Sequence, residues 1–282
     1  MSGAAARRLV FLAIAVAIAL SIAASASAER LEAVLQPKTI QGWLRYVAAV
    51  EARIDRELRE NLPFLDIDRV PPAQQTRHLA ALRRGEVVVS RAVARDGTAS
   101  GIEIDGGMIN HWRGTVFVPK VALDLLLKTL QEPQSDVHRQ EDVLSSRVEI
   151  TGANSQKLYL RLRRTKFVTV VYDTEYDTDY RRLDPDRALS NSLSTRIVEI
   201  ENAGTPRERA LPEGDDHGFM WRLNSYWRFK QVDNGVMVEV ESLTLSRTLP
   251  RIIGALLRPI VNSTARESIT RTLASMRARF AP

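Results

Sequence analysis

The feature that most constrains this chain is a stretch of alternating side chains over residues 219–247, divided by the pair Asn234-Gly235. Apolar and polar residues alternate on both sides of the pair, as in strands whose two faces meet different surroundings. An Asn-Gly pair between two such runs is the strongest short signal for a β-hairpin. A two-residue turn at this pair predicts the cross-strand partners Lys230 with Glu239, Arg228 with Glu241 and Phe229 with Val240. We therefore expect an antiparallel hairpin in which charges pair with charges and apolar side chains with apolar ones.

Helices and strands are also predicted in the segments before this hairpin. Thr39 is expected to be the N-cap of a first helix that ends near Pro63. Two more helices are predicted over residues 78–83 and 121–130, and the second of these runs is apolar enough to be buried. Residues 86–93 and 101–104 predict a first hairpin, turned at Asp96-Gly97. Further strands are predicted over residues 108–118, 146–151, 157–183 and 192–201.

A long amphipathic helix is predicted at the end of the chain. Apolar residues recur there at steps of three or four: Ile252, Ile253, Leu256, Leu257, Ile260, Ile269, Leu273, Met276 and Phe280. Pro259 lacks a backbone N–H, so we expect it to kink or split this helix. A single long helix needs a concave sheet to bury its apolar stripe, which predicts the α+β fold class with a curved antiparallel β-sheet.

This order of elements resembles the START-like (SRPBCC, helix-grip) superfamily, which includes lipid-transfer domains, pollen-allergen relatives and polyketide cyclases. The resemblance is carried by FMWRLNSYWRF and GVMVEVESLTLSR, by the link Thr248-Leu249-Pro250 and by the helix after it. The strings NHWRGTVFVP and GFMWRLNSYWRF are similar to those of uncharacterised exported bacterial members. The resemblance implies an α+β fold in which a curved antiparallel sheet grips the long C-terminal helix.

The resemblance also implies an apolar cavity between the sheet and the terminal helix, and such a concavity is a ready ligand site. On this interpretation the ligand-binding residues are His111, Trp112, Trp221, Leu223, Trp227, Phe229 and Thr244, with Ser225 and Ser242 as further polar contacts. The expected partner is a hydrophobic small molecule or lipid, with transient membrane contact as an option and no catalysis. A second interpretation stays open, in which the same aromatic residues fill the core of an interaction module.

An enzyme of the cyclase or hydrolase type is the other alternative, with His111, Arg113 or Tyr226 as the acid, base or oxyanion donor. An inward-facing histidine would suit that role because its pKa lies near working pH. Either His111 or Trp112 must face inward, because neighbours on a strand point to opposite faces. The sequence has no G-x-S-x-G elbow, no cysteine and no Gly-rich phosphate loop, so no catalytic residue is predicted.

No metal, cofactor or nucleic acid is predicted as a partner. The acidic run over residues 172–180 lacks the glycine turn of a calcium loop, and its period of two instead predicts a strand with carboxylates on one face and tyrosines on the other. Arg161 and Arg163 on an adjacent strand are expected to offset the acids. The net charge is only +6 and basic residues are interleaved with acidic ones, which argues against nucleic-acid binding.

Residues 1–28 carry the three parts of a secretory signal: Arg7 and Arg8, an apolar run over residues 9–22, and Ala26-Ser27-Ala28. The run is shorter than the roughly 20 residues that span a bilayer as a helix. We expect cleavage after Ala28, a periplasmic or secreted protein, and one START-like domain over residues 29–282. An uncleaved anchor is the alternative, and it too places the chain outside the cytoplasm. The oligomeric state stays open.

Overall fold

The computed structural model describes residues 35–95, 101–132, 142–165, 169–213, 216–248 and 251–280, with side chains of the last helix described from Arg266 onward. The expected signal, residues 1–28, and the expected Asp96-Gly97 turn lie outside the described residues.

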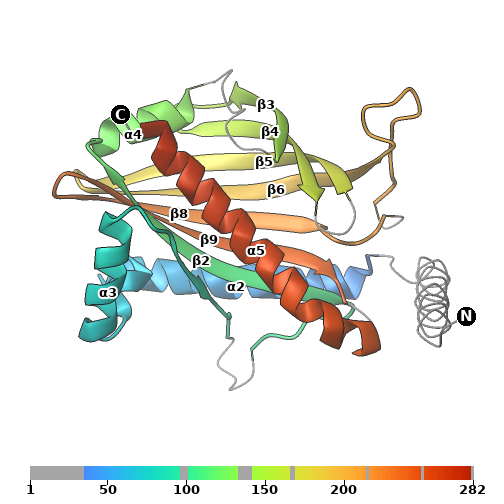
Figure 1. Cartoon of the computed structure of the whole chain (residues 1–282), viewed down its shortest axis with the longest axis horizontal. Helices are drawn as coiled ribbons and strands as arrows, with labels where there is room; N and C mark the ends of the chain where they lie inside the picture. Colours follow the sequence, from blue (N-terminus) through green and yellow to red (C-terminus); the bar gives the residue numbers. More distant parts are fainter. Residues whose placement is uncertain are drawn as a thin grey trace, which may run out of the picture.

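Nine strands in the described residues form one antiparallel sheet (Figure 1). They are β1 (Val88–Arg91), β2 (Gly107–Pro119), β3 (Val143–Ile150), β4 (Ser155–Thr165), β5 (Thr169–Asp184), β6 (Arg187–Glu201), β7 (Arg209–Ala210), β8 (Arg222–Val232) and β9 (Gly235–Arg247). Their order across the sheet is β1-β2-β9-β8-β6-β5-β4-β3, and β7 pairs with β6. The period-two pattern of the sequence therefore becomes two different faces of one sheet.

Helices lie on both faces of this sheet (Figure 1). They are α2 (Pro37–Arg59), the short 3₁₀ helix η1 (Asp66–Arg69), α3 (Pro72–Arg83), α4 (Leu123–Gln131) and α5 (Arg251–Phe280). Figure 1 shows α5 running diagonally across the sheet, and its main contacts are with β2. The predicted α+β class, with a long C-terminal helix packed on an antiparallel sheet, is confirmed.

The two faces are named after the helices that pack on them. On the α5 face, Val116 of β2 and Phe229 of β8 form one buried cluster with Ile269 and Leu273 of α5. The α2 face carries a second cluster, which joins sheet residues to the apolar stripe of α2: Tyr226, Leu243, Leu245, Trp43, Tyr46, Val50 and Ile54. The sheet is therefore a central layer whose strands bury side chains on both sides.

The β8–β9 hairpin forms as predicted, but the predicted register is wrong by two residues. Phe229 pairs with Val238, and the turn residues are Asp233 and Asn234. A slip of two keeps every side chain on its face, so alternation alone does not separate the two registers. The deciding contact comes from outside the hairpin: Gly235 pairs with Pro119 of β2, and a Cβ there would lie 2.2 Å from a backbone oxygen of β2. Glycine is therefore needed in the strand itself.

The predicted first hairpin is also wrong. Only Val88–Arg91 is a strand, and residues 101–104 form none. β1 instead pairs with β2, where Val88 lies opposite Thr115. This pairing places Val89 against the buried cluster on the α5 face, which a local hairpin away from the sheet would not provide.

Three smaller expectations about helices need correction. Thr39 is not the N-cap of α2: the helix begins at Pro37, and the Thr39 hydroxyl donates a hydrogen bond to the Asp105 carbonyl. α4 is amphipathic and not buried all round, because Leu125 is 56% exposed while Leu126 is buried. α5 is not split, since it continues through Pro259 as one helix.

Candidate functional site on the α5 face

The α2 face carries a buried network of charged side chains. Burial opposes the ionisation of Glu57, but hydrogen bonds from Arg69, Arg228 and Arg53 outweigh it and lower the pKa of Glu57 to about 2. Glu241 of β9 accepts hydrogen bonds from Arg53 at 2.6 Å and from Arg113 at 3.2 Å. Because these charges are matched, the network is a fixed polar interface between α2 and the sheet.

His111 belongs to this network and not to the α5 face. Burial lowers the pKa of its ring, against the opposing effect of Glu241, so the ring is neutral. Its Nε2 donates to Glu241 at 2.6 Å, and its Nδ1 accepts from the Tyr46 hydroxyl at 2.8 Å. The Tyr46 hydroxyl in turn accepts from the backbone N–H of Ala94 at 2.9 Å. Both ring nitrogens are therefore used within the chain.

The other two residues of the enzyme alternative also lie on the α2 face. Arg113 donates to Asp66 at 2.6 Å as well as to Glu241. The Tyr226 hydroxyl donates to Glu51 of α2 at 2.8 Å. These partners hold both side chains between α2 and the sheet, on the side away from α5.

Five of the seven predicted ligand residues lie on the α5 face: Trp112, Leu223, Trp227, Phe229 and Thr244. Trp227 stacks on Phe229 with ring centroids 6.3 Å apart. Trp221 does not join them, because it precedes β8 and packs in the α2-face cluster, where its Nε1 donates to Asp216 at 3.1 Å. Phe229 was expected to line open space, but its side chain is only 1% exposed within the apolar cluster. Phe229 therefore belongs mainly to the packed core of this face.

A row of small polar side chains crosses the centre of the α5 face. Each member lies opposite the next on the neighbouring strand: Ser242 on β9, Ser225 on β8, Ser192 on β6, Thr178 on β5 and Gln156 on β4. We call these five residues the hydroxyl row, after the hydroxyl groups of the first four. Its three serines are half-buried, and Thr178 and Ser192 share a hydrogen bond of 2.9 Å. Trp112 of β2 lies opposite Ser242 and ends the row.

The hydroxyl row lies between two apolar clusters of the α5 face. One is the cluster around Phe229 and Leu273 that α4 and α5 cover. The other contains Leu162 of β4, Tyr172 of β5 and, at its margin, Leu223 of β8. Half-buried serines at the centre of a sheet, flanked by apolar clusters on both sides, are the arrangement of a ligand site with few polar groups.

Buried hydrogen-bond donors without partners are concentrated at the same place. Within the described residues, four buried side-chain polar atoms make no hydrogen bond, and three of them are on the α5 face: Trp112 Nε1, Tyr172 Oη and Tyr176 Oη. Burial raises the pKa of both tyrosines, so both are protonated donors. Thr174 lowers the pKa of Tyr176 by less than burial raises it. The Thr174 hydroxyl itself donates to the Leu160 carbonyl. Such unpaired buried groups are uncommon in native proteins.

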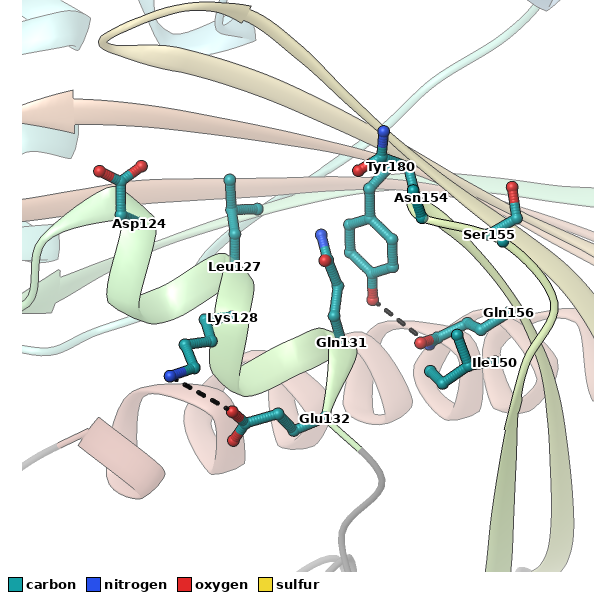
Figure 2. Close-up of a pocket in the computed structure, with 12 residues that line it drawn as sticks. Asp124, Leu127, Lys128, Gln131, Glu132, Ile150, Asn154, Ser155, Gln156 and Tyr180 are labelled. Atoms are coloured by element: carbon teal, nitrogen blue, oxygen red, sulfur yellow. Dashed lines mark hydrogen bonds and ion pairs between the residues drawn. The ribbon is translucent and has the colours of Figure 1, made fainter.

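A cleft of about 520 Å³ opens at the β4 end of the hydroxyl row (Figure 2). It lies between α4 and the β3–β4 turn, and Tyr180 and Gln156 belong both to its lining and to the α5 face. Gln156 donates to the Tyr180 hydroxyl at 3.5 Å, and that hydroxyl donates to the Leu130 carbonyl at 3.4 Å. Burial raises the pKa of Tyr180 to about 12, so it is neutral in the cleft.

Sequence reasoning missed Tyr172, Tyr176 and Ser192 as site residues. The tyrosines were expected on one strand face, and that face is confirmed. The local sequence does not show that β6 pairs with both β5 and β8. This pairing places Ser192 between Thr178 and Ser225. The available signal was the absence of charge on the tyrosine side of β5. Its carboxylate side behaves as expected, with Arg161 bound to Asp173 at 2.7 Å.

No group of three or more His, Asp or Glu side chains in the described residues is placed to hold a metal ion. Among the described helices, none is both long and apolar enough to cross a membrane.

Comparison with solved structures gives START-related proteins at low identity. The human StarD13 lipid transfer and protein localization domain is 10% identical with a TM-score of 0.41, and the match covers 76% of this chain and 98% of that domain. A STAR-related lipid transfer protein from Xanthomonas axonopodis is 16% identical with a TM-score of 0.38, over 63% and 99%. The Zhui aromatase/cyclase from Streptomyces sp. R1128 is 12% identical with a TM-score of 0.40, over 61% and 94%. The sequence matches no family model and no curated protein.

The elements themselves decide the fold. A first helix is followed by an antiparallel sheet, and the last helix packs across one face of that sheet. By this order and this packing, the chain has the α+β architecture expected from its sequence, in which a long C-terminal helix packs across one face of an antiparallel sheet.

Proposed function

We propose that this chain binds a hydrophobic small molecule or lipid between the α5 face and α5, without catalysing a reaction. The observation that carries the proposal is the hydroxyl row, with its three half-buried serines, between two apolar clusters. In a core that is filled by the protein's own side chains, large apolar residues would occupy the centre of the sheet, from which water is most completely excluded. Small, partly accessible serines there support a bound molecule instead.

The cleft beside α4 is the proposed opening of this site. It shares Tyr180 and Gln156 with the α5 face, and it has a volume suited to a small molecule in transit. The protein is proposed to act in the periplasm or as a secreted protein, with transient membrane contact during exchange. The support for this location is the charged, apolar and small-residue pattern of residues 1–28.

Native mass spectrometry of the mature protein, purified from the periplasm of the cells that make it, tests the proposal. We expect a co-purifying apolar molecule at one copy per chain, which organic extraction then identifies. Protein that is consistently empty, and whose melting temperature does not shift with any member of a lipid panel, would overturn it.

Two matched tryptophan variants locate the molecule on one face. Trp227→Leu removes an indole from the α5 face, so we expect at least about fivefold weaker affinity and a lower bound amount, the loss that follows from about 1 kcal/mol of contact. Trp43→Leu removes an indole from the α2 face and should lower stability without changing the bound amount. Equal losses in both variants would contradict the α5-face location.

A further inference from the structure

We propose that the ligand of the α5 face is an uncharged, elongated molecule whose polar atoms are hydrogen-bond acceptors, such as an ester or ketone of a long-chain compound. This inference rests on the proposed function and narrows the class of molecule. A fatty acid anion or an anionic phospholipid is the class it excludes.

The first support is the separation of charge between the two faces. Two neighbouring rows of cross-strand partners run over the α5 face from β2 to β3, one through Thr178 and the other through Tyr176. None of the described residues in these two rows is charged. The charged groups that flank these rows already have partners: Glu199, beyond Tyr172, is bound by the backbone N–H and the ring of His217. Arg164, whose charge acts on both Tyr172 and Tyr176, is paired with Asp142. An ionised ligand would therefore lose its water without gaining an opposite charge in these rows.

The second support is the chemistry of the unpaired groups. Trp112 Nε1 can only donate a hydrogen bond, and its indole is the end of the hydroxyl row. The hydroxyls of Tyr172 and Tyr176 remain protonated because burial raises their pKa values. Carbonyl or ether oxygens of a ligand would satisfy all three donors without placing a charge in the site.

The spacing of these donors indicates an elongated molecule. Trp112 on β2 and the two tyrosines on β5 are separated by four strand-to-strand steps, which is about 19 Å at about 4.8 Å a step. Tyr172 and Tyr176 are four residues apart on one strand, which is about 13 Å. A compact ligand could reach one donor but not the whole set.

A neutral probe and a charged probe with the same acyl chain test the inference. Methyl palmitate and palmitate, each delivered from cyclodextrin to the full mature protein at pH 8, are compared by native mass spectrometry and tryptophan fluorescence. At that pH palmitate is ionised, since carboxyl groups have pKa values near 4. We expect the ester to bind at least about tenfold more tightly than the anion.

Variants then test the donors themselves. Because methyl palmitate has a single ester group, one of the two variants Tyr172→Phe and Tyr176→Phe should weaken ester binding about fivefold, as expected for one neutral hydrogen bond. Tyr159→Phe is the matched control, because that hydroxyl binds Asp173 on the opposite face and should leave ester affinity unchanged.

The outcomes separate this inference from the proposed function. Equal binding of ester and anion, or tighter binding of the anion, overturns the inference while the proposed function stands. Preference for the ester with no difference between the three phenylalanine variants overturns the role of the tyrosine donors. Binding of neither probe by a protein that is also empty when purified from the periplasm overturns both.

Discussion

Tyr176 is the residue at which ligand binding and stability should change in opposite directions. Its hydroxyl is buried without a partner in the described structure, and such a group costs about 1–3 kcal/mol in lost hydration. We expect Tyr176→Phe to raise the free energy of unfolding of the ligand-free protein by about 1 kcal/mol, measured by urea denaturation. Tyr159→Phe, which loses a hydrogen bond to Asp173, should lower it. A loss of stability in Tyr176→Phe would mean that this hydroxyl has a partner within the chain.

Glu239 is the residue through which stability should depend on pH. Burial raises its pKa to about 7, although the charges of Arg228 and Arg113 and the backbone N–H of Asp66 oppose the rise. The folded chain therefore keeps a proton on Glu239 at pH values where the unfolded chain, with a carboxyl pKa near 4.3, has lost it. This contribution is fully present below about pH 4 and is lost as the pH rises through 7.

The test compares the wild-type protein with Glu239→Gln by urea denaturation between pH 5 and pH 8. We expect the wild type to lose up to about 3 kcal/mol relative to the glutamine variant over this range, because each pKa unit corresponds to about 1.4 kcal/mol. Parallel curves for the two proteins would show that Glu239 does not titrate in this range.

At the scale of elements, the close approach of α5 to the sheet depends on a glycine. A Cβ at Gly114 of β2 would lie 2.4 Å from Ile269 and 2.7 Å from Leu273 of α5, so a side chain there must displace both of them. We expect Gly114→Ala to lower the free energy of unfolding by about 1–3 kcal/mol, the usual range for an overpacked core. Hydrogen exchange should show the loss of protection first in α5.

Gly152 in the β3–β4 turn provides the matched control. A Cβ there would meet nothing closer than 3.6 Å, so Gly152→Ala should change stability by less than about 0.5 kcal/mol. Equal effects of the two alanine substitutions would contradict the tight packing of α5 on β2.

The elements also show how far local pattern reaches. Alternation identified β2, β8 and β9 and the side chains that share each of their faces. It did not fix the β8–β9 register, because that depends on the contact between Gly235 and β2. The partner of β1 was also not predictable, because its pairing with β2 depends on apolar packing under α5.

At the scale of the whole molecule, the sheet separates two chemically different interiors. The α2 face holds a charged network whose members satisfy one another, and the α5 face holds uncharged polar groups between apolar clusters. The fold class and the C-terminal helix were predictable because they depend on periodicity and element order. The position of His111 was not predictable, since alternation leaves open which of two neighbours faces α5, and its contacts with Tyr46 and Glu241 come from distant elements. The same limit applies to the hydroxyl row, whose members come from five strands.

The most direct test of ligand binding on the α5 face is a crystal structure of the mature protein purified from the periplasm, with its native contents retained. We expect electron density for an elongated molecule between α5 and the hydroxyl row, with an oxygen within hydrogen-bond distance of the Tyr176 hydroxyl. Side chains of α5 packed directly onto Ser192 and Ser225, with no density between them and a protein partner for Tyr176, would contradict it.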